Sequence, residues 1–155
     1  MEAVSRVLSA CPQLAHFACH GLQYVADPSA GHLILHDGLL SITKISELRL
    51  DHAELAFLSA CETCRGGAGL ADEAITLATA FQLAGYRHVV GTLWAIADRL
   101  APTAANNVYE ALTESGLPGI ETSTTALAVD AAVRALRNKC PGTPRRWAPY
   151  IHIGP

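Results

Sequence analysis

A histidine and a cysteine stand where an imidazole could activate a thiol. His20 follows the apolar run 14–19 and precedes Gly21, and Cys61 follows the apolar run 55–59. A thiol becomes a useful nucleophile when a base or a positive environment favours the thiolate. Residues that leave the ends of neighbouring strands, about 4.8 Å apart, can reach each other with little rearrangement of the loops. The pair therefore predicts nucleophilic chemistry by Cys61 with His20 as its base.

Glycines beside both residues suit acyl transfer. Gly21 frees a backbone N–H to point at a developing oxyanion, and with the N–H of Cys61 it could form a two-donor hole. Three glycines lie within residues 66–69, shortly after Cys61. They let the backbone and a substrate approach each other closely.

The elements that must position this pair alternate along the chain. Alternating strands and helices imply parallel pairing through crossovers and a layered α/β fold, with ligands and chemistry at the carboxyl edge of the sheet. Apolar runs predict strands over 14–19, 32–36, 55–59, 88–93 and 150–153. Amphipathic patterns predict helices over 2–10 and 43–48, after the caps Asp72 and Ser123, and around Pro102.

Composition restricts the partners. The 155 residues, half of them hydrophobic, suffice for one domain with a buried core. The net charge of −3 argues against nucleic acid or a membrane surface as a partner, and the pair Arg145-Arg146 is expected to be a solvated loop. No secretory leader or membrane-length apolar run is found. The five cysteines are therefore expected to be reduced thiols of a cytoplasmic protein.

The motifs resemble those of the CHAT domain, a family of caspase-like peptidases in the clan that contains caspases and separase. The resemblance extends from about residue 13 to the end of the chain, and its motifs come in the order of the family. They are His-Phe-Ala-Cys-His-Gly at 16–21, Leu-Ser-Ala-Cys-Glu-Thr at 58–63, Ala-Phe and Ala-Gly within 80–85, Val-Val-Gly-Thr-Leu-Trp to Asp at 89–98, and Trp-Ala-Pro-Tyr at 147–150. The resemblance implies a caspase-like three-layer sandwich with a mostly parallel sheet.

The same resemblance implies a function, a cysteine endopeptidase that cleaves protein substrates through a Cys61 thioester, with His20 as acid and base. It implies neither a cofactor nor a metal. Family members typically follow helical arrays such as tetratricopeptide repeats, which implies a regulated signalling protease with a sensor region of the parent polypeptide and a protein substrate as partners. Glu62, Trp94 and Asp98 are expected to line the cleft, although Asp98 could instead cap the next helix.

Two features depart from the pattern of caspases themselves. The interval from His20 to Cys61 is 41 residues, against roughly 50 in caspases, and Ser59 stands where caspases have glutamine. The sequence is therefore similar to the broader clan and not to caspases themselves. Only a helix precedes the strand that leads to His20, so residues 1–155 are expected to form a single domain that lacks its N-terminal part.

Two other functions remain open. One is a non-catalytic signalling or scaffold module that keeps the fold. The other is a zinc or redox protein, because Cys61 and Cys64 form a Cys-x-x-Cys that Cys19 and His20 could complete as a zinc site. His16 shares the strand face of His20 and is expected to be a hydrogen-bonded, partly buried histidine rather than a second base.

Overall fold

The computed structural model describes residues 2–24, 27–60, 63, 76–97, 99–113 and 120–155. The elements in chain order are α1 (Glu2–Ser9), β1 (Leu14–Phe17), β2 (His20–Leu22), η1 (Pro28–Ala30), β3 (His32–Leu35), β4 (Gly38–Ser41), α2 (Ile42–Ser46), β5 (Leu55–Leu58), α3 (Leu77–Ala84), β6 (His88–Thr92), α4 (Ala101–Thr113), η2 (Thr122–Thr124), α5 (Thr125–Lys139), η3 (Pro144–Arg146) and β7 (Tyr150–Ile153).

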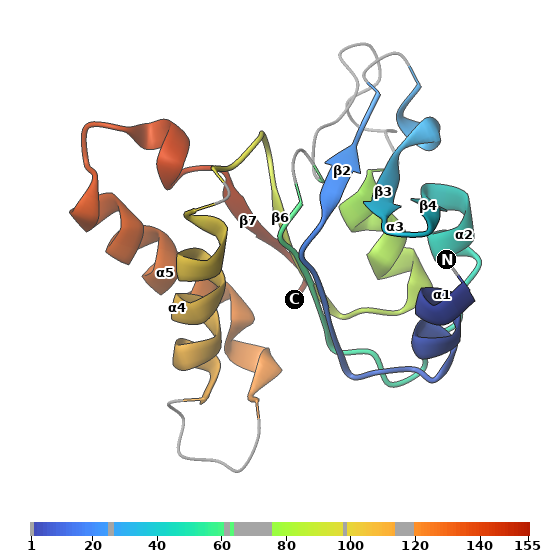
Figure 1. Cartoon of the computed structure of the whole chain (residues 1–155). Coiled ribbons are helices and arrows are strands. Elements are labelled where there is room, and N and C mark those ends of the chain that lie inside the picture. The colour runs from blue at the N-terminus through green and yellow to red at the C-terminus, as the bar shows by residue number, and fades with distance from the viewer. Residues whose placement is uncertain (1, 25–26, 61–62, 64–75, 98, 114–119) are drawn as a thin grey trace.

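The main sheet has four strands in the order β1-β5-β6-β7. β1, β5 and β6 are parallel, and β7 runs antiparallel to β6. Helices α4 and α5 cover one face of this sheet, and α1, α2 and α3 lie on the other side (Figure 1). The predicted α/β architecture with three layers and a mostly parallel sheet is confirmed.

The central strand β5 is buried on both faces, which is why its sequence is continuously apolar. Successive side chains of a strand point to opposite faces. Leu55 and Phe57 pack in the core formed with α4 and α5, whereas Ala56 and Leu58 pack in the core formed with α2 and α3. The strand is therefore held from both sides directly before the segment that carries Cys61.

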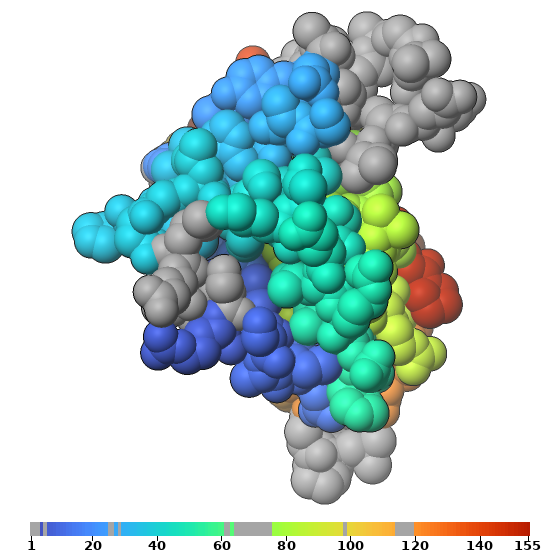
Figure 2. Space-filling view, turned by 90° about the vertical axis from the view of Figure 1, so that its right-hand side faces the viewer, coloured from blue at the N-terminus to red at the C-terminus, as the bar shows by residue number. Residues whose placement is uncertain are grey.

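A second, smaller sheet holds His20. Strands β2, β3 and β4 form an antiparallel sheet in that order. The expectation of one strand running from 14 to 19 and ending at His20 is wrong, because the chain leaves the main sheet after Phe17 and His20 begins β2, opposite Ile34. The residues before α2, coloured blue to cyan, occupy much of the face seen in Figure 2.

Two helix starts also differ from the prediction. Helix α3 begins at Leu77, and Thr76 caps it by accepting a hydrogen bond from the N–H of Thr79, whereas Asp72, the predicted cap, lies outside the described residues. Ser123 lies inside the short turn η2 and does not cap α5. None of the described helices combines the length and apolar character needed to span a membrane.

Candidate active site

The carboxyl ends of β1 and β5 lie side by side. In this parallel pair, Phe17 is opposite Leu58. His20 and Cys61 each follow that pair by three residues along the chain. The prediction that both motifs leave the same edge of the sheet is therefore confirmed for the strands, while Cys61 itself lies outside the described residues.

Both flanks of the Cys61 segment are tied to β6 through Thr92. The hydroxyl of Thr92 donates to the carbonyl of Ala60 at 2.8 Å, and its backbone N–H donates to the hydroxyl of Thr63 at 2.9 Å. The N–H of Ala78 in α3 donates to the carbonyl of Thr63 at 3.1 Å. Ala60, Thr63 and Thr92 are all buried. These bonds fix the positions of Ala60 and Thr63, the described residues on either side of positions 61–62.

Neither Thr63 nor Thr92 is among the residues that the sequence predicts for the site. Thr63 and Thr92 are both within the motif segments that carry the family resemblance. The position of Thr92 at the end of the buried strand β6 indicates such a role, because a buried hydroxyl needs a hydrogen-bond partner.

His16 bridges the ends of β1 and β5. Its Nε2 lies 2.8 Å from the hydroxyl of Ser59, and its ring packs against Phe57 and Tyr109 at centroid distances of 4.9 and 5.7 Å. Desolvation lowers the pKa of His16, so its imidazole is neutral at neutral pH. The prediction that His16 is hydrogen-bonded is confirmed, but despite these ring contacts the residue is exposed rather than partly buried, and it does not share a strand with His20.

A groove of about 430 Å³ opens at this edge of the sheet. His20, which is exposed, lines it together with His16 and Ser59, and the first turns of α4 form the facing wall. Gly21 is buried next to His20 in β2. Because β2 pairs with β3 alone, alternate backbone N–H groups of β2 point away from that ladder.

The thiol of Cys19 lines the same groove but differs from an activated thiol. Burial raises the pKa of Cys19, so this thiol keeps its proton at neutral pH. Within the described part of the chain, no group of three or more His, Cys, Asp or Glu side chains could hold a metal ion. Cys61 and Cys64, which the zinc and redox alternatives need, lie outside it.

The loop after β6 contributes to the groove through Ile96. Trp94, from the same loop, donates its indole N–H to the carbonyl of Arg145 in η3 at 3.2 Å. This bond joins the loop beside the groove to the segment before β7. Glu62 and Asp98, also predicted to line the cleft, lie outside the described residues.

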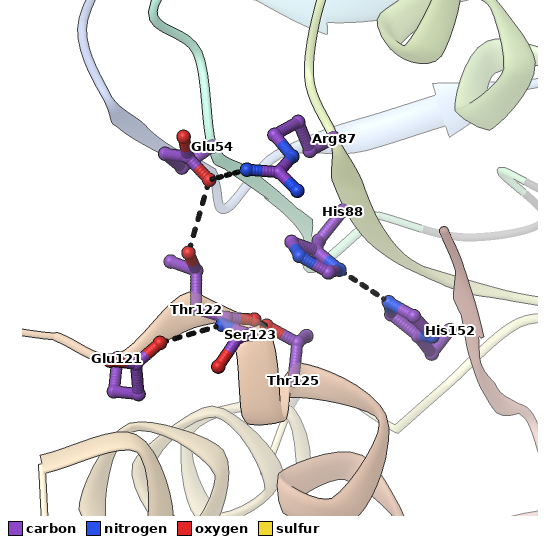
Figure 3. A network of polar contacts seen from close by, with 8 residues as sticks. All are labelled: Glu54, Arg87, His88, Glu121, Thr122, Ser123, Thr125 and His152. Atoms are coloured by element: carbon purple, nitrogen blue, oxygen red, sulfur yellow. Dashed lines mark hydrogen bonds and ion pairs between the residues drawn. The ribbon is translucent and has the colours of Figure 1, made fainter. Parts of the chain in front are cut away.

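A second polar cluster lies at the opposite edge of the sheet, around the start of β6 (Figure 3). The Nδ1 of His88 and the Nε2 of His152 are 3.0 Å apart, and their rings stack. Glu54 forms an ion pair with Arg87 at 3.8 Å and accepts a hydrogen bond from Thr122 at 3.2 Å. The cluster joins β7 to β6 and η2 to the start of β5, so it contributes to the architecture rather than to the groove.

The layered α/β fold with its mixed, mostly parallel sheet is compatible with a caspase-like fold. The CHAT domain model matches residues 1–155, the whole chain. The chain therefore belongs to the CHAT domain family, a caspase-like domain family. A comparison with curated proteins gave no significant match.

Proposed function

We propose that this CHAT domain is a cysteine endopeptidase in which Cys61 is the nucleophile and His20 the acid and base. The observation that carries the proposal is the register of β1 and β5, in which Phe17 is opposite Leu58. Because paired strands lie about 4.8 Å apart, the chain leaves the sheet side by side after Phe17 and after Leu58. His20 and Cys61 follow these two exits by three residues each.

The reaction would begin with transfer of the Cys61 thiol proton to His20. The thiolate then attacks the carbonyl carbon of the scissile peptide, and the π electron pair moves to the oxygen, where the N–H groups of Gly21 and Cys61 donate hydrogen bonds. When the C–N bond breaks, His20 gives its proton to the leaving nitrogen and a thioester remains. Water attacks the thioester, His20 accepts its proton, and the acid product leaves as the thiolate is restored.

The surroundings support this division of roles. The pKa of Cys19 is raised and that of His16 is lowered, both by desolvation. Cys19 is therefore a poor nucleophile at neutral pH, and His16, hydrogen-bonded to Ser59, is engaged elsewhere. His20 is exposed on the groove, as an acid that must reach a substrate nitrogen needs to be.

The substrate and the regulation follow from the same proposal. The open groove, about 430 Å³ in volume, suits an extended peptide segment of a protein substrate. A sensor region with tetratricopeptide-like repeats in the parent polypeptide would hold the protease inactive until a signal arrives. Free thiols at Cys11, Cys19 and Cys140 agree with a reducing, cytoplasmic location.

The test is cleavage of a diverse peptide library by the wild-type protein and by its Cys61→Ala and Cys19→Ala variants. The proposal expects products from the wild type and from Cys19→Ala, and none from Cys61→Ala. Mass spectrometry of the products would give the cleavage specificity directly. Equal turnover by all three proteins would contradict the proposal that Cys61 is the nucleophile. If a folded wild type cleaves nothing even with the parent polypeptide's activating signal supplied, the domain is a non-catalytic scaffold.

A further inference from the structure

Charge is distributed very unevenly along this chain. Residues 131–155 contain five arginines and lysines and no aspartate or glutamate, whereas residues 1–130 contain six basic and 14 acidic residues. The C-terminal segment is thus strongly cationic in a protein whose net charge is −3. A single-sign patch on an otherwise acidic protein attracts ligands of opposite charge.

The fold places four of these five cations at or beside one groove. Arg134, Arg137 and Trp147 line a groove of about 500 Å³ on the outer side of α5. The guanidinium of Arg137 lies over the Trp147 ring, 5.7 Å from its centroid. Arg145 and Arg146 in η3 directly precede Trp147. Arg145 and Arg146 are exposed, as expected of a solvated segment, and α5 brings further arginines to the same side of Trp147.

Most of this charge is not neutralised within the described structure. Arg134 is paired with Asp130 at 2.8 Å, one turn earlier in α5. The other four cations are exposed and form no ion pair among the described residues. They are Arg137, Lys139, Arg145 and Arg146.

We propose that the groove on α5, lined by Asp130, Val133, Arg134, Arg137, Asn138 and Trp147, with Arg145 and Arg146 directly before Trp147, binds an acidic segment of a partner protein. Asp130 is paired with Arg134, which leaves Arg137 and the two η3 arginines for the carboxylates of the partner. Guanidinium groups bind carboxylates through charge-assisted, often bidentate hydrogen bonds. The amide of Asn138 adds a donor and an acceptor for a peptide backbone.

A short acidic peptide fits this surface better than nucleic acid does. The cationic surface is confined to the end of α5 and to η3, and the rest of the chain carries eight more acidic than basic residues. A long polyanion that extends beyond the groove would therefore meet repulsion, whereas an acidic segment a few residues long would not.

A hydrogen bond links the segment beside this cationic groove to a loop of the candidate active site. Trp94 in the loop after β6 donates to the carbonyl of Arg145, and Ile96 of the same loop lines the groove that contains His20. In Figure 1, the orange-red turn before β7 lies toward the same end of the sheet as the loop that leaves β6. A partner held at η3 would thus lie beside the loop that lines the groove containing His20.

Binding can be measured without turnover, in the Cys61→Ala background. The probe is a short fluorescent peptide of alternating Glu and Gly, and the matched peptide has Gln in place of Glu. The double variant Arg137→Glu/Arg146→Glu reverses charge at the groove. The control, Arg6→Glu/Lys44→Glu, makes the same change in net charge on α1 and α2, across the sheet from α5. Circular dichroism checks that each variant is folded, and Arg137→Gln/Arg146→Gln replaces the reversal if it is not.

Fluorescence anisotropy should show binding of the Glu peptide that weakens as salt is added, and little binding of the Gln peptide. The groove variant should lower affinity about tenfold or more, and the control variant less than about twofold. Equal loss in both variants, or no binding of the Glu peptide, would overturn the proposal. Tighter binding of a single-stranded oligonucleotide than of the peptide would overturn it too, by assigning the groove to nucleic acid.

Discussion

The hydroxyl of Thr92, at the end of β6, donates a 2.8 Å hydrogen bond to the carbonyl of Ala60, just beyond the end of β5. Both residues are buried, so water cannot replace this bond. Because Ala60 directly precedes Cys61, the bond fixes the point from which the candidate nucleophile leaves the sheet. Positioning of this kind is a large part of what an enzyme contributes to catalysis.

Replacing Thr92 with valine tests this role, because valine keeps the shape and removes the hydroxyl. The carbonyl of Ala60 would lose its donor, and we expect the free energy of unfolding to fall by about 1–3 kcal/mol. Cleavage should also fall in kcat/KM, because Cys61 would be less well positioned. Urea denaturation and peptide cleavage measure the two effects. Thr113→Val, at an exposed helical position, is the control and should change neither by much.

Gly85 ends α3 in a conformation that other residues rarely adopt, with φ of +123°. A Cβ there would lie 2.3 Å from the carbonyl oxygen of Leu50. Gly85→Ala should therefore lower the free energy of unfolding by about 3 kcal/mol, whereas Gly142→Ala, where a Cβ meets no atom within 4 Å, should change it by less than about 0.5 kcal/mol. Comparable stability of the two variants in denaturant melts would rule out the strained conformation at Gly85.

Stability should decrease in mild acid because of buried histidines. Burial, followed by the nearby Arg87, lowers the pKa of His88, and burial together with His88 lowers the pKa of His152, each from an ordinary value of 6.5. The unfolded chain therefore binds protons near pH 6.5, while the folded chain binds them only at lower pH. The free energy of unfolding is then highest above about pH 6.5 and falls as the pH drops through the folded pKa values.

Urea midpoints measured from about pH 8 down to about pH 5 would show this loss, in a range above the titration of ordinary carboxyl groups. His152→Asn should make the pH dependence shallower, since it removes one titrating ring and its repulsion of His88. The matched control is His36→Asn, exposed in the turn between β3 and β4. A pH dependence that His152→Asn leaves unchanged would argue against the histidine pair as its source.

The central strands could be predicted from the sequence because they are buried on both faces. The run that became β5 is continuously apolar, β6 is buried at every position, and their parallel pairing follows from the helix between them. The edge of the sheet at which the chain leaves β1 and β5, three residues before His20 and Cys61, could therefore be predicted as well.

The small sheet could not be predicted in the same way. The apolar run continues through Ala18 and Cys19, so nothing local marks the departure of the chain from the main sheet after Phe17. That departure depends on pairing of β2 with β3, in which His20 is opposite Ile34. The start of α3 likewise depends on a distant residue, because the side chain of Gln23 accepts a hydrogen bond from the N–H of Leu77.

The reactivity of the Cys61 thiol as a function of pH tests the pairing of His20 with Cys61 most directly. Alkylation by iodoacetamide, followed at each cysteine by peptide mass spectrometry, needs no substrate, and the thiol of Cys19 provides an internal reference. If His20 activates Cys61, alkylation of Cys61 should rise at a pH at least about one unit below the ordinary thiol pKa of about 8.5, and His20→Ala should move it back. An identical pH profile for Cys61 in the wild type and in His20→Ala would contradict the proposed catalytic pair.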